Sequence, residues 1–548
     1  MSTSDKKTCK EITRRDVLKK SGLALGGMAI GSVAMGGAMS AFAGKKTQSI
    51  DECECNPPKG CPTGECEYPP ELDDTQQYTY FNKLEKWKPT QGNPSEGIPE
   101  TYIPPEPNEM RITFMGSNIP NQLRRAQQMM SIFVEVGNAM GKPDQFVFDC
   151  GSGVCTNYNA MGISLGRMDK IFLTHLHGDH ISDLIHIYCF GAVADRKSPL
   201  FVFGSSPSKV KSPRPPRRLY DDGIKAFCKN LREACRWHSE SQSFISTSYE
   251  SYEPPTRKSW GLPHNPRPVS DDPPDDGYAI IPIELDWKKY GKVEGDNVAY
   301  YNPDTGVKIT HFPVIHTRKG SVGYKLEWNG LSMIYTGDTK PEYHSVNQAA
   351  GVNVFIHEMN PPAEVWAFKN MGLYEPPHTD WPTYDSFPGV VDFAKMVQNS
   401  SHTPQGAFGY LLGLINPPPQ LTVATHFPVA DDMVVCALDS IRKHCPWVVW
   451  DKNDPNSSNM IWSFDLMVLK VFQDGGKKAT IEQYQADVSD FTFQAVGPQE
   501  LQHDDLNPPK YCDSDGNGDP YAQIDTSTEI PSCDNNGGEN CNYREDGY

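Results

Sequence analysis

The stretch "IFLTHLHGDHISDL", residues 171–184, places three histidines and one aspartate within six positions, directly after an apolar run. The apolar run is typical of a buried strand, so the polar cluster falls where a strand ends and a loop begins. In the turn that follows, His175 and His177 can point at one metal ion while Asp179 and His180 point at a second. The glycine inside the cluster gives the backbone the freedom that such a tight path requires. The stretch therefore predicts a site for two metal ions.

Three further metal-capable side chains follow apolar runs later in the chain. His316 comes after one such run, Asp338 lies at a predicted strand end before a turn, and His426 lies at another. A carboxylate between two cations can bind one with each oxygen, and this is the role expected for Asp338. His311 competes with His316, but it lies inside the apolar run "ITHFPV", so His316 is preferred. Imidazole and carboxylate ligands at this density favour two zinc ions, with iron or manganese as alternatives.

Short runs of β-branched and aromatic residues begin near residue 111 and fall into two sets. The first set comprises residues 111–115, 131–136, 145–150, 170–175 and 200–204. The second set comprises residues 278–285, 307–312, 322–328, 331–338, 353–358 and 421–427. Helical or turn segments separate the runs. This pattern predicts an α/β fold of two packed sheets flanked by helices, with the polar candidates at strand ends.

The order HxHxDH, a later histidine, a GD aspartate and a last strand-end histidine resembles the metallo-β-lactamase superfamily. Four further segments look like its ribonuclease Z and arylsulfatase-like branch: "ITFMGSNIP" (112–120), "FDCGSG" (148–153), "FIHEMN" (355–360) and "SSHTPQGAFGYL" (400–411). The resemblance runs from about residue 110 to 475. It implies an αββα four-layer sandwich with a two-metal site.

The resemblance also implies how the ligands are shared. The first ion would be held by His175, His177 and His316, the second by Asp179, His180 and His426, and both by Asp338. A hydroxide between the ions would be the nucleophile, because two cations lower the pKa of bound water towards neutrality. Asp179 would in addition orient that hydroxide.

Hydrolysis also requires a proton for the leaving group. His402 in "SSHTP" is similar to the catalytic histidine of the branch, and Glu358 in "HEMN" to the carboxylate that orients and charges it. A structural hydrogen-bonding role is the alternative for this pair, since the loop after Glu358 is longer than the branch pattern. His357 is interpreted as a histidine satisfied at the edge of a sheet.

The first 43 residues resemble a twin-arginine export signal. "TRRDVLKKSG" places Arg14 and Arg15 before a Gly/Ala-rich apolar stretch, and "AFA" (41–43) offers the small residues that a signal peptidase requires. A membrane anchor is the alternative, although glycine dilutes the apolar stretch. The signal predicts the twin-arginine machinery as a partner and a periplasmic or secreted protein. No stable transmembrane segment is expected once residues 1–43 are removed.

The remaining chain is predicted to consist of a hydrolase domain with an extension at each end. The hydrolase domain spans residues 109–475, with loop insertions at about 205–275 and 361–400. Residues 44–108 are interpreted as an irregular Pro/Cys-rich arm and residues 476–548 as an extension with an acidic tail. In an oxidising compartment, the terminal cysteines predict disulfides: Cys53, Cys55, Cys61 and Cys66, and Cys512, Cys533 and Cys541. A zinc knuckle is the alternative for the first group.

Two segments allow two interpretations each. "DSDGNGD" sets Asp513, Asp515, Asn517 and Asp519 at the alternating spacing of calcium loops. Calcium loops usually carry a glutamate at their twelfth position, and the loop that starts at Asp513 does not. A solvated acidic loop is therefore favoured over a calcium site. The aromatic-rich segment 366–389 is either a lid over the active site or a loop that packs on the core.

Charge narrows the choice of substrate. The chain has a formal net charge of −18, and without residues 1–43 it keeps 44 basic and 66 acidic side chains. Such a surface repels polyanions, so a small-molecule ester is favoured over long nucleic acid. The leading prediction is an exported hydrolase with two metal ions that cleaves phosphodiester or sulfate esters. The alternatives are a lactonase or β-lactamase, a ribonuclease Z-like nuclease, and a metal-binding protein without activity.

Replacing Arg14 and Arg15 by lysine should keep the precursor in the cytoplasm, because the twin-arginine pathway reads the guanidinium pair rather than charge alone. Cell fractionation and immunoblotting measure this. The matched control, Lys19→Arg with Lys20→Arg, should be exported like the wild type. Undiminished export of the Arg14→Lys, Arg15→Lys chain would show that another route carries the protein.

Overall fold

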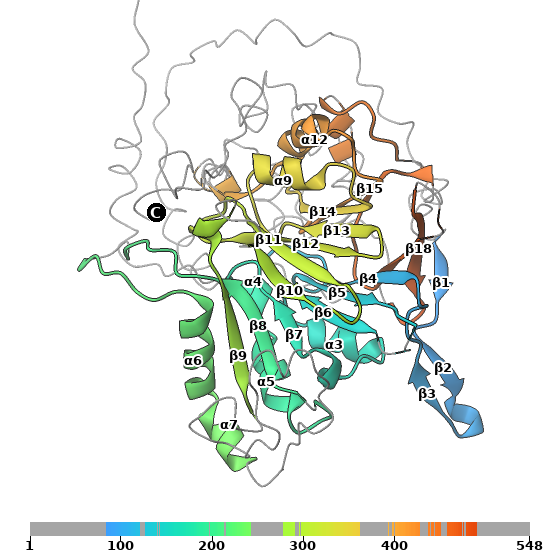
Figure 1. Cartoon of the computed structure of the whole chain (residues 1–548), viewed down its shortest axis with the longest axis vertical. Coiled ribbons are helices and arrows are strands. Elements are labelled where there is room, and N and C mark those ends of the chain that lie inside the picture. Colours follow the sequence, from blue (N-terminus) through green and yellow to red (C-terminus); the bar gives the residue numbers. More distant parts are fainter. Residues whose placement is uncertain are drawn as a thin grey trace, which may run out of the picture. The chain divides into compact units, whose positions relative to one another are not determined.

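The computed structural model describes residues 84–489 (Figure 1), with gaps at 121–126, 140, 142, 197, 213–214, 243–277, 291–294, 296, 362–388, 390–392, 394–396, 399–400, 428–436, 439, 443, 451–456, 474 and 476–477. The chain divides into two compact units, residues 1–59 and 60–548, and every described residue lies in the second. The predicted export signal, the terminal cysteine groups, the calcium-like loop and nearly all of the segment 366–389 lie outside the described residues.

The first of two large sheets has nine strands in the order β1-β18-β17-β4-β5-β6-β7-β8-β9. Its strands are β1 (Glu85–Trp87), β4 (Glu109–Gly116), β5 (Ser131–Val136), β6 (Asp144–Phe148), β7 (Lys170–Phe172), β8 (Leu200–Ser205), β9 (Ile280–Leu285), β17 (Met467–Phe472) and β18 (Thr480–Ala486). Strands β6 to β9 run parallel to one another, whereas antiparallel pairs join β18, β17, β4, β5 and β6. Every residue of β4 and β5 is buried, because both faces of the sheet are covered.

The second large sheet has seven strands in sequence order. Its strands are β10 (Val298–Tyr301), β11 (Lys308–Pro313), β12 (Val322–Trp328), β13 (Leu331–Tyr335), β14 (Val354–Glu358), β15 (Leu421–Thr425) and β16 (Met460–Trp462). The first four strands pair antiparallel and β13 to β16 pair parallel. A separate hairpin pairs β2 (Thr90–Asn93) with β3 (Ile98–Tyr102).

Helices cover the outer faces of both sheets (Figure 1). The first sheet carries α3 (Val154–Ala160), α5 (Leu184–Gly191), α6 (Ile224–Ala234) and α7 (Arg236–Ser241), and the second carries α9 (Tyr343–Ala349) and α12 (Gln405–Leu414). Short 3₁₀ turns lie at η3 (Pro94–Glu96), η4 (Leu165–Arg167) and η6 (Trp287–Lys289). The predicted αββα sandwich is confirmed. None of the helices in the described part of the chain combines the length and hydropathy needed to cross a bilayer.

Aromatic side chains fill the space between the two sheets. Phe172 on β7 stacks on Phe203 of β8 with ring centroids 4.2 Å apart, and it meets Tyr324 of β12 edge-on at 5.5 Å. All three side chains are fully buried. The Tyr324 hydroxyl also donates a hydrogen bond of 2.7 Å to the carbonyl of Leu173, and Val322 N donates to Thr174 O at 3.0 Å. The second sheet is therefore fixed against the segment that leads from β7 into the histidine motif.

The structure differs from the strand prediction at both limits of the first sheet. The sequence pattern assigns residues 278–285 to the second set, but β9 pairs in parallel with β8 in the first sheet, because periodicity does not reveal which sheet a strand joins. Strands β1 and β18 extend the sheet beyond the predicted range 109–475. The Trp87 ring anchors β1, since it lies 4.6 Å from the Arg111 guanidinium carbon and 5.2 Å from the Lys470 ammonium.

Candidate metal centre and active site

The histidine motif lies at the carboxyl end of β7. His175 and His177 precede the one-turn helix α4 (Gly178–Ile181), and Asp179 and His180 lie within that helix. His177 still has an extended backbone, with φ −74° and ψ 152°, so the chain passes from extended to helical within one residue. This change of direction gathers the four side chains at one end of the strand.

Three other segments bring the remaining candidates to the motif. His316 follows β11, Asp338 follows β13 and His426 follows β15. His426 has a left-handed backbone (φ 54°), which is uncommon for a residue with a side chain. Gly337 has φ 62°, and a Cβ atom there would lie 2.5 Å from Cβ of Thr174. Glycine at this position therefore allows the Asp338 turn to approach the motif closely.

The first group of candidate ligands consists of three histidines and one aspartate. Ligand atoms of His175, His177, His316 and Asp338 all lie within 4.8 Å of one another. His316 Nε2 is 3.0 Å from His177 Nδ1, and it is 3.8 Å from Asp338 Oδ2. His175 Nε2 is 3.9 Å from the same Asp338 oxygen. These four side chains therefore surround one candidate position for a metal ion.

The second group shares Asp338 with the first. Ligand atoms of Asp179, His180, Asp338 and His426 also lie within 4.8 Å of one another. His180 Nε2 is 3.2 Å from Asp338 Oδ1 and 3.4 Å from Asp179 Oδ2. His426 Nε2 is 3.3 Å from Asp179 Oδ2 and 3.6 Å from Asp338 Oδ2. The structure thus brings all seven predicted ligands together in two groups joined by Asp338.

The histidine pKa values shift in opposite directions in the two groups. Burial lowers the pKa of His175, His177 and His316, and neutral imidazole is the form that binds a cation. Burial alone would also lower the pKa of His180 and His426, but nearby aspartates reverse the effect and raise the pKa of His426 to about 10. Buried carboxylates require positive charge beside them, and bound cations can supply it in place of protons.

The donor set of both groups fits divalent metal ions. His175 Nε2 and His180 Nε2 are buried and have no hydrogen-bond partner among the described residues. Four nitrogen or oxygen donors per group, with one carboxylate common to both, match the ligands that zinc, iron and manganese take in proteins. The residues present can therefore hold two ions.

A third carboxylate, that of Asp149, supports the histidine motif without belonging to either group. Asp149 Oδ2 lies 2.8 Å from His180 Nδ1, and it accepts hydrogen bonds of 2.8 Å from the hydroxyls of Thr174 and Tyr335. Its other oxygen accepts from Thr174 N. Such partners fix the orientation of a metal-binding imidazole. Sequence reasoning gave Asp149 no role, although its position at the end of the strand next to β7, within "FDCGSG", is a signal that could have found it.

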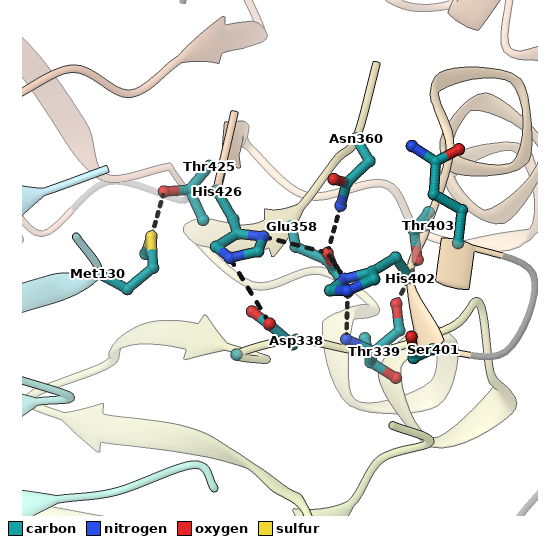
Figure 2. Close-up of polar contacts among 12 residues, drawn as sticks. Met130, Asp338, Thr339, Glu358, Asn360, Ser401, His402, Thr403, Thr425 and His426 are labelled. Carbon is teal, nitrogen blue, oxygen red and sulfur yellow. Dashed lines mark hydrogen bonds and ion pairs between the residues drawn. The ribbon is translucent and has the colours of Figure 1, made fainter. Parts of the chain in front are cut away.

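Glu358 and His402 form a pair beside the second group (Figure 2). Glu358 ends β14, and its Oε2 lies 2.7 Å from His402 Nδ1 and 3.4 Å from His426 Nδ1. Asn360 Nδ2 donates to the same oxygen at 2.7 Å, and Thr339 N donates to Oε1. Burial alone would lower the pKa of His402, but Glu358 raises it above the usual value. The carboxylate thus contacts both the predicted proton donor and a candidate metal ligand.

The His402 ring faces the candidate ligands from one side. Its centroid lies 5.1 Å from that of His316 and 5.7 Å from that of His426, to which it is nearly parallel. Two other histidines of the second sheet play no part in these groups within the described chain. His311 is buried on β11, and His357 is buried between Phe355 and Phe408.

Comparison with known proteins agrees with this architecture. The profile of the metallo-beta-lactamase superfamily matches residues 141–188. Ribonuclease BN of Proteus mirabilis is 26% identical over 263 residues, which cover 45% of this chain and 76% of the relative. Ribonuclease Z of Halalkalibacterium halodurans is 25% identical over 263 residues, which cover 44% and 72%. Among solved structures, the short form of human tRNase Z is 18% identical, with a TM-score of 0.37 and coverage of 65% and 98%.

The αββα fold, with histidines and aspartates at its strand ends, defines the class of the protein. This is the metallo-β-lactamase fold; the profile of that superfamily matches residues 141–188, and the chain has relatives among the ribonucleases Z and BN.

Purified protein should contain about two metal ions per chain, because each group supplies several ligands and Asp338 serves both. Asp338→Ala should lose most of this metal. Elemental analysis after zinc loading and desalting measures the content. The control His311→Gln changes a buried histidine outside both groups and should keep both ions. Less than one ion in the wild type, even after zinc loading, would contradict a two-metal site.

Proposed function

We propose that the protein is an exported hydrolase that uses two zinc ions to cleave phosphodiesters of modest size. The observation that carries this proposal is the Glu358–His402 pair, which lies directly beside two groups of metal-binding side chains. A histidine held by a buried carboxylate supplies a proton donor that a metal-only site lacks. The ribonuclease relatives, whose substrate is a phosphodiester, support the same chemistry.

The ligand assignment follows the two groups. His175, His177 and His316 would hold one ion, Asp179, His180 and His426 the other, and Asp338 both. Two bound zinc ions would activate a water molecule and stabilise negative charge on the ester oxygens. Asp149 holds His180 in position for its ligand, and the carbonyl of Ser401 lies 2.8 Å from His316 Nδ1 and does the same for that ring.

Three residues would orient the attacking water and supply the proton for the leaving group. Asp179 would accept a hydrogen bond from the attacking water and so orient it. His402 uses Nδ1 to contact Glu358, which leaves Nε2 to give a proton to the leaving-group oxygen. Glu358 stabilises the protonated form of this ring, because a buried carboxylate 2.7 Å away favours the positive charge.

Charge supports a small substrate rather than a long RNA. Without residues 1–43 the chain has 66 acidic and 44 basic side chains, so a long polyanion would be repelled unless a local basic surface intervenes. Export through the twin-arginine pathway, inferred from Arg14 and Arg15, would also separate the protein from cytoplasmic transfer RNA. A small ester and the export machinery are thus the partners that we propose.

A panel of substrates tests the proposed reaction. Zinc-loaded protein should hydrolyse bis(nitrophenyl) phosphate faster than nitrophenyl phosphate, nitrophenyl sulfate, a lactone, a β-lactam or a short RNA, because the site suits a diester with one negative charge. Release of nitrophenolate and gel analysis of the RNA measure the rates. Preference for the sulfate ester, the lactone or the RNA would replace the diester proposal. A metal-loaded protein that cleaves none of them would indicate a binding role.

His402→Ala should slow turnover of a diester with a poor leaving group by roughly 10² to 10⁴, the range for loss of a general acid. The loss should be much smaller for nitrophenyl esters, because nitrophenolate departs with little protonation. Elemental analysis should find wild-type metal content, since His402 belongs to neither of the two groups that Asp338 joins. Loss of metal, or equal slowing of both esters, would show that His402 is not the proton donor.

A further inference from the structure

Two cysteines lie side by side on the outer face of the first sheet. Cys189 belongs to α5, and Cys235 lies at the junction where α6 ends and α7 begins. The two residues are 46 positions apart in the chain, yet the Cys235 side chain lies near enough to Cys189 to raise its pKa. Neither residue belongs to the candidate active site.

His238 fixes the backbones of both cysteines. Its backbone N–H donates a hydrogen bond of 3.0 Å to the carbonyl of Cys235, and its Nε2 lies 2.8 Å from the carbonyl of Cys189. The His238 ring also packs on Phe190, the neighbour of Cys189, with centroids 5.1 Å apart. One residue thus contacts both chain segments and holds the backbones of the two cysteines close to each other.

The surroundings of the pair are apolar. Cys189 is 6% exposed and Cys235 is 9% exposed, and both belong to the apolar cluster between the first sheet and its helices. Burial, together with the neighbouring thiol, raises the pKa of Cys189 to about 12. A thiol in this environment forms little thiolate at neutral pH, and no group of metal-binding side chains found in the described residues includes either cysteine. Catalytic and metal-binding roles are therefore not supported.

We propose that Cys189 and Cys235 form a disulfide when the protein, folded or refolding, meets an oxidant of the disulfide class. One thiolate attacks a sulfur of oxidised glutathione and releases one glutathione thiol. The second thiolate then attacks the mixed disulfide and releases the other. The two cysteines lose two electrons and two protons in total, and oxidised glutathione gains them.

The bond would join two parts of the structure that flank the histidine motif. Helix α5 begins three residues after the end of α4, which carries Asp179 and His180. Helix α6 follows the loop whose Asp222 carboxylate lies 2.7 Å from Nε of Arg318, two residues after His316. Closing a loop of this length reduces the entropy of the unfolded chain, so the bond should stabilise the fold. This inference does not depend on the proposed hydrolytic activity.

Peptide mapping can detect the bond without ambiguity. Trypsin places Cys189 in peptide 171–196, Cys235 in peptide 233–236 and Cys228 in peptide 226–229, each with one cysteine. The full chain is reduced, exchanged into oxidised glutathione at mildly alkaline pH, and blocked with N-ethylmaleimide. Mass spectrometry of the unreduced digest should then show peptides 171–196 and 233–236 linked to each other.

Matched variants make the mapping decisive. Cys228→Ser, which changes a buried cysteine of α6 outside the pair, should leave the link unchanged, whereas Cys189→Ser should abolish it. Because burial slows access of the oxidant, the exchange is repeated during refolding from urea. Separate alkylated peptides under both conditions, or a link from either cysteine to another partner, would overturn the proposal.

Thermal unfolding supplies a second measurement. Oxidised wild-type and Cys228→Ser chains should melt about 3–8 °C above their reduced forms. The double variant Cys189→Ser, Cys235→Ser should show no such difference between oxidising and reducing buffer. A mapped link without any rise in melting temperature would refute the stabilising role.

Discussion

Burial of the Asp338 carboxylate is the constraint on which the rest of the structure depends. Its oxygens lie between 3.2 and 3.9 Å from imidazole nitrogens of His175, His180, His316 and His426. A buried negative charge without compensation is costly, so this carboxylate is tolerated only where those side chains converge. They come from both sheets. The charge at the centre therefore favours one relative arrangement of the two halves of the sandwich.

The need to orient the buried histidines explains the polar contacts around the centre. A metal-binding imidazole must point in one direction, and its second nitrogen is the group through which the protein controls that direction. Asp149 holds His180 in this way, and the carbonyl of Ser401 holds His316. Asp149 and Ser401 are themselves buried, so the packing around them helps to fix the orientation of each ring.

Much of the architecture could be predicted from the sequence because ligands and strands leave strong local signals. HxHxDH after an apolar run located the motif, and Asp338 and His426 were recognisable as polar residues at the ends of strands. The sheet membership of β9 was not, since a parallel edge strand has the same pattern in either sheet. Asp149 was also missed. Its role depends on a neighbour 31 positions away, His180, and such a pairing leaves no spacing in the sequence.

The position of Glu358 has a consequence for how the centre responds to its surroundings. One oxygen of this carboxylate serves His402 at 2.7 Å and lies 3.4 Å from His426, a ligand of the second group. A cation bound through His426 and a proton held by His402 therefore act on the same negative charge. Thermodynamic reciprocity then requires that each event change the affinity of the other by an equal factor. Proton binding at His402 and metal binding at His426 would therefore be two linked equilibria in this protein.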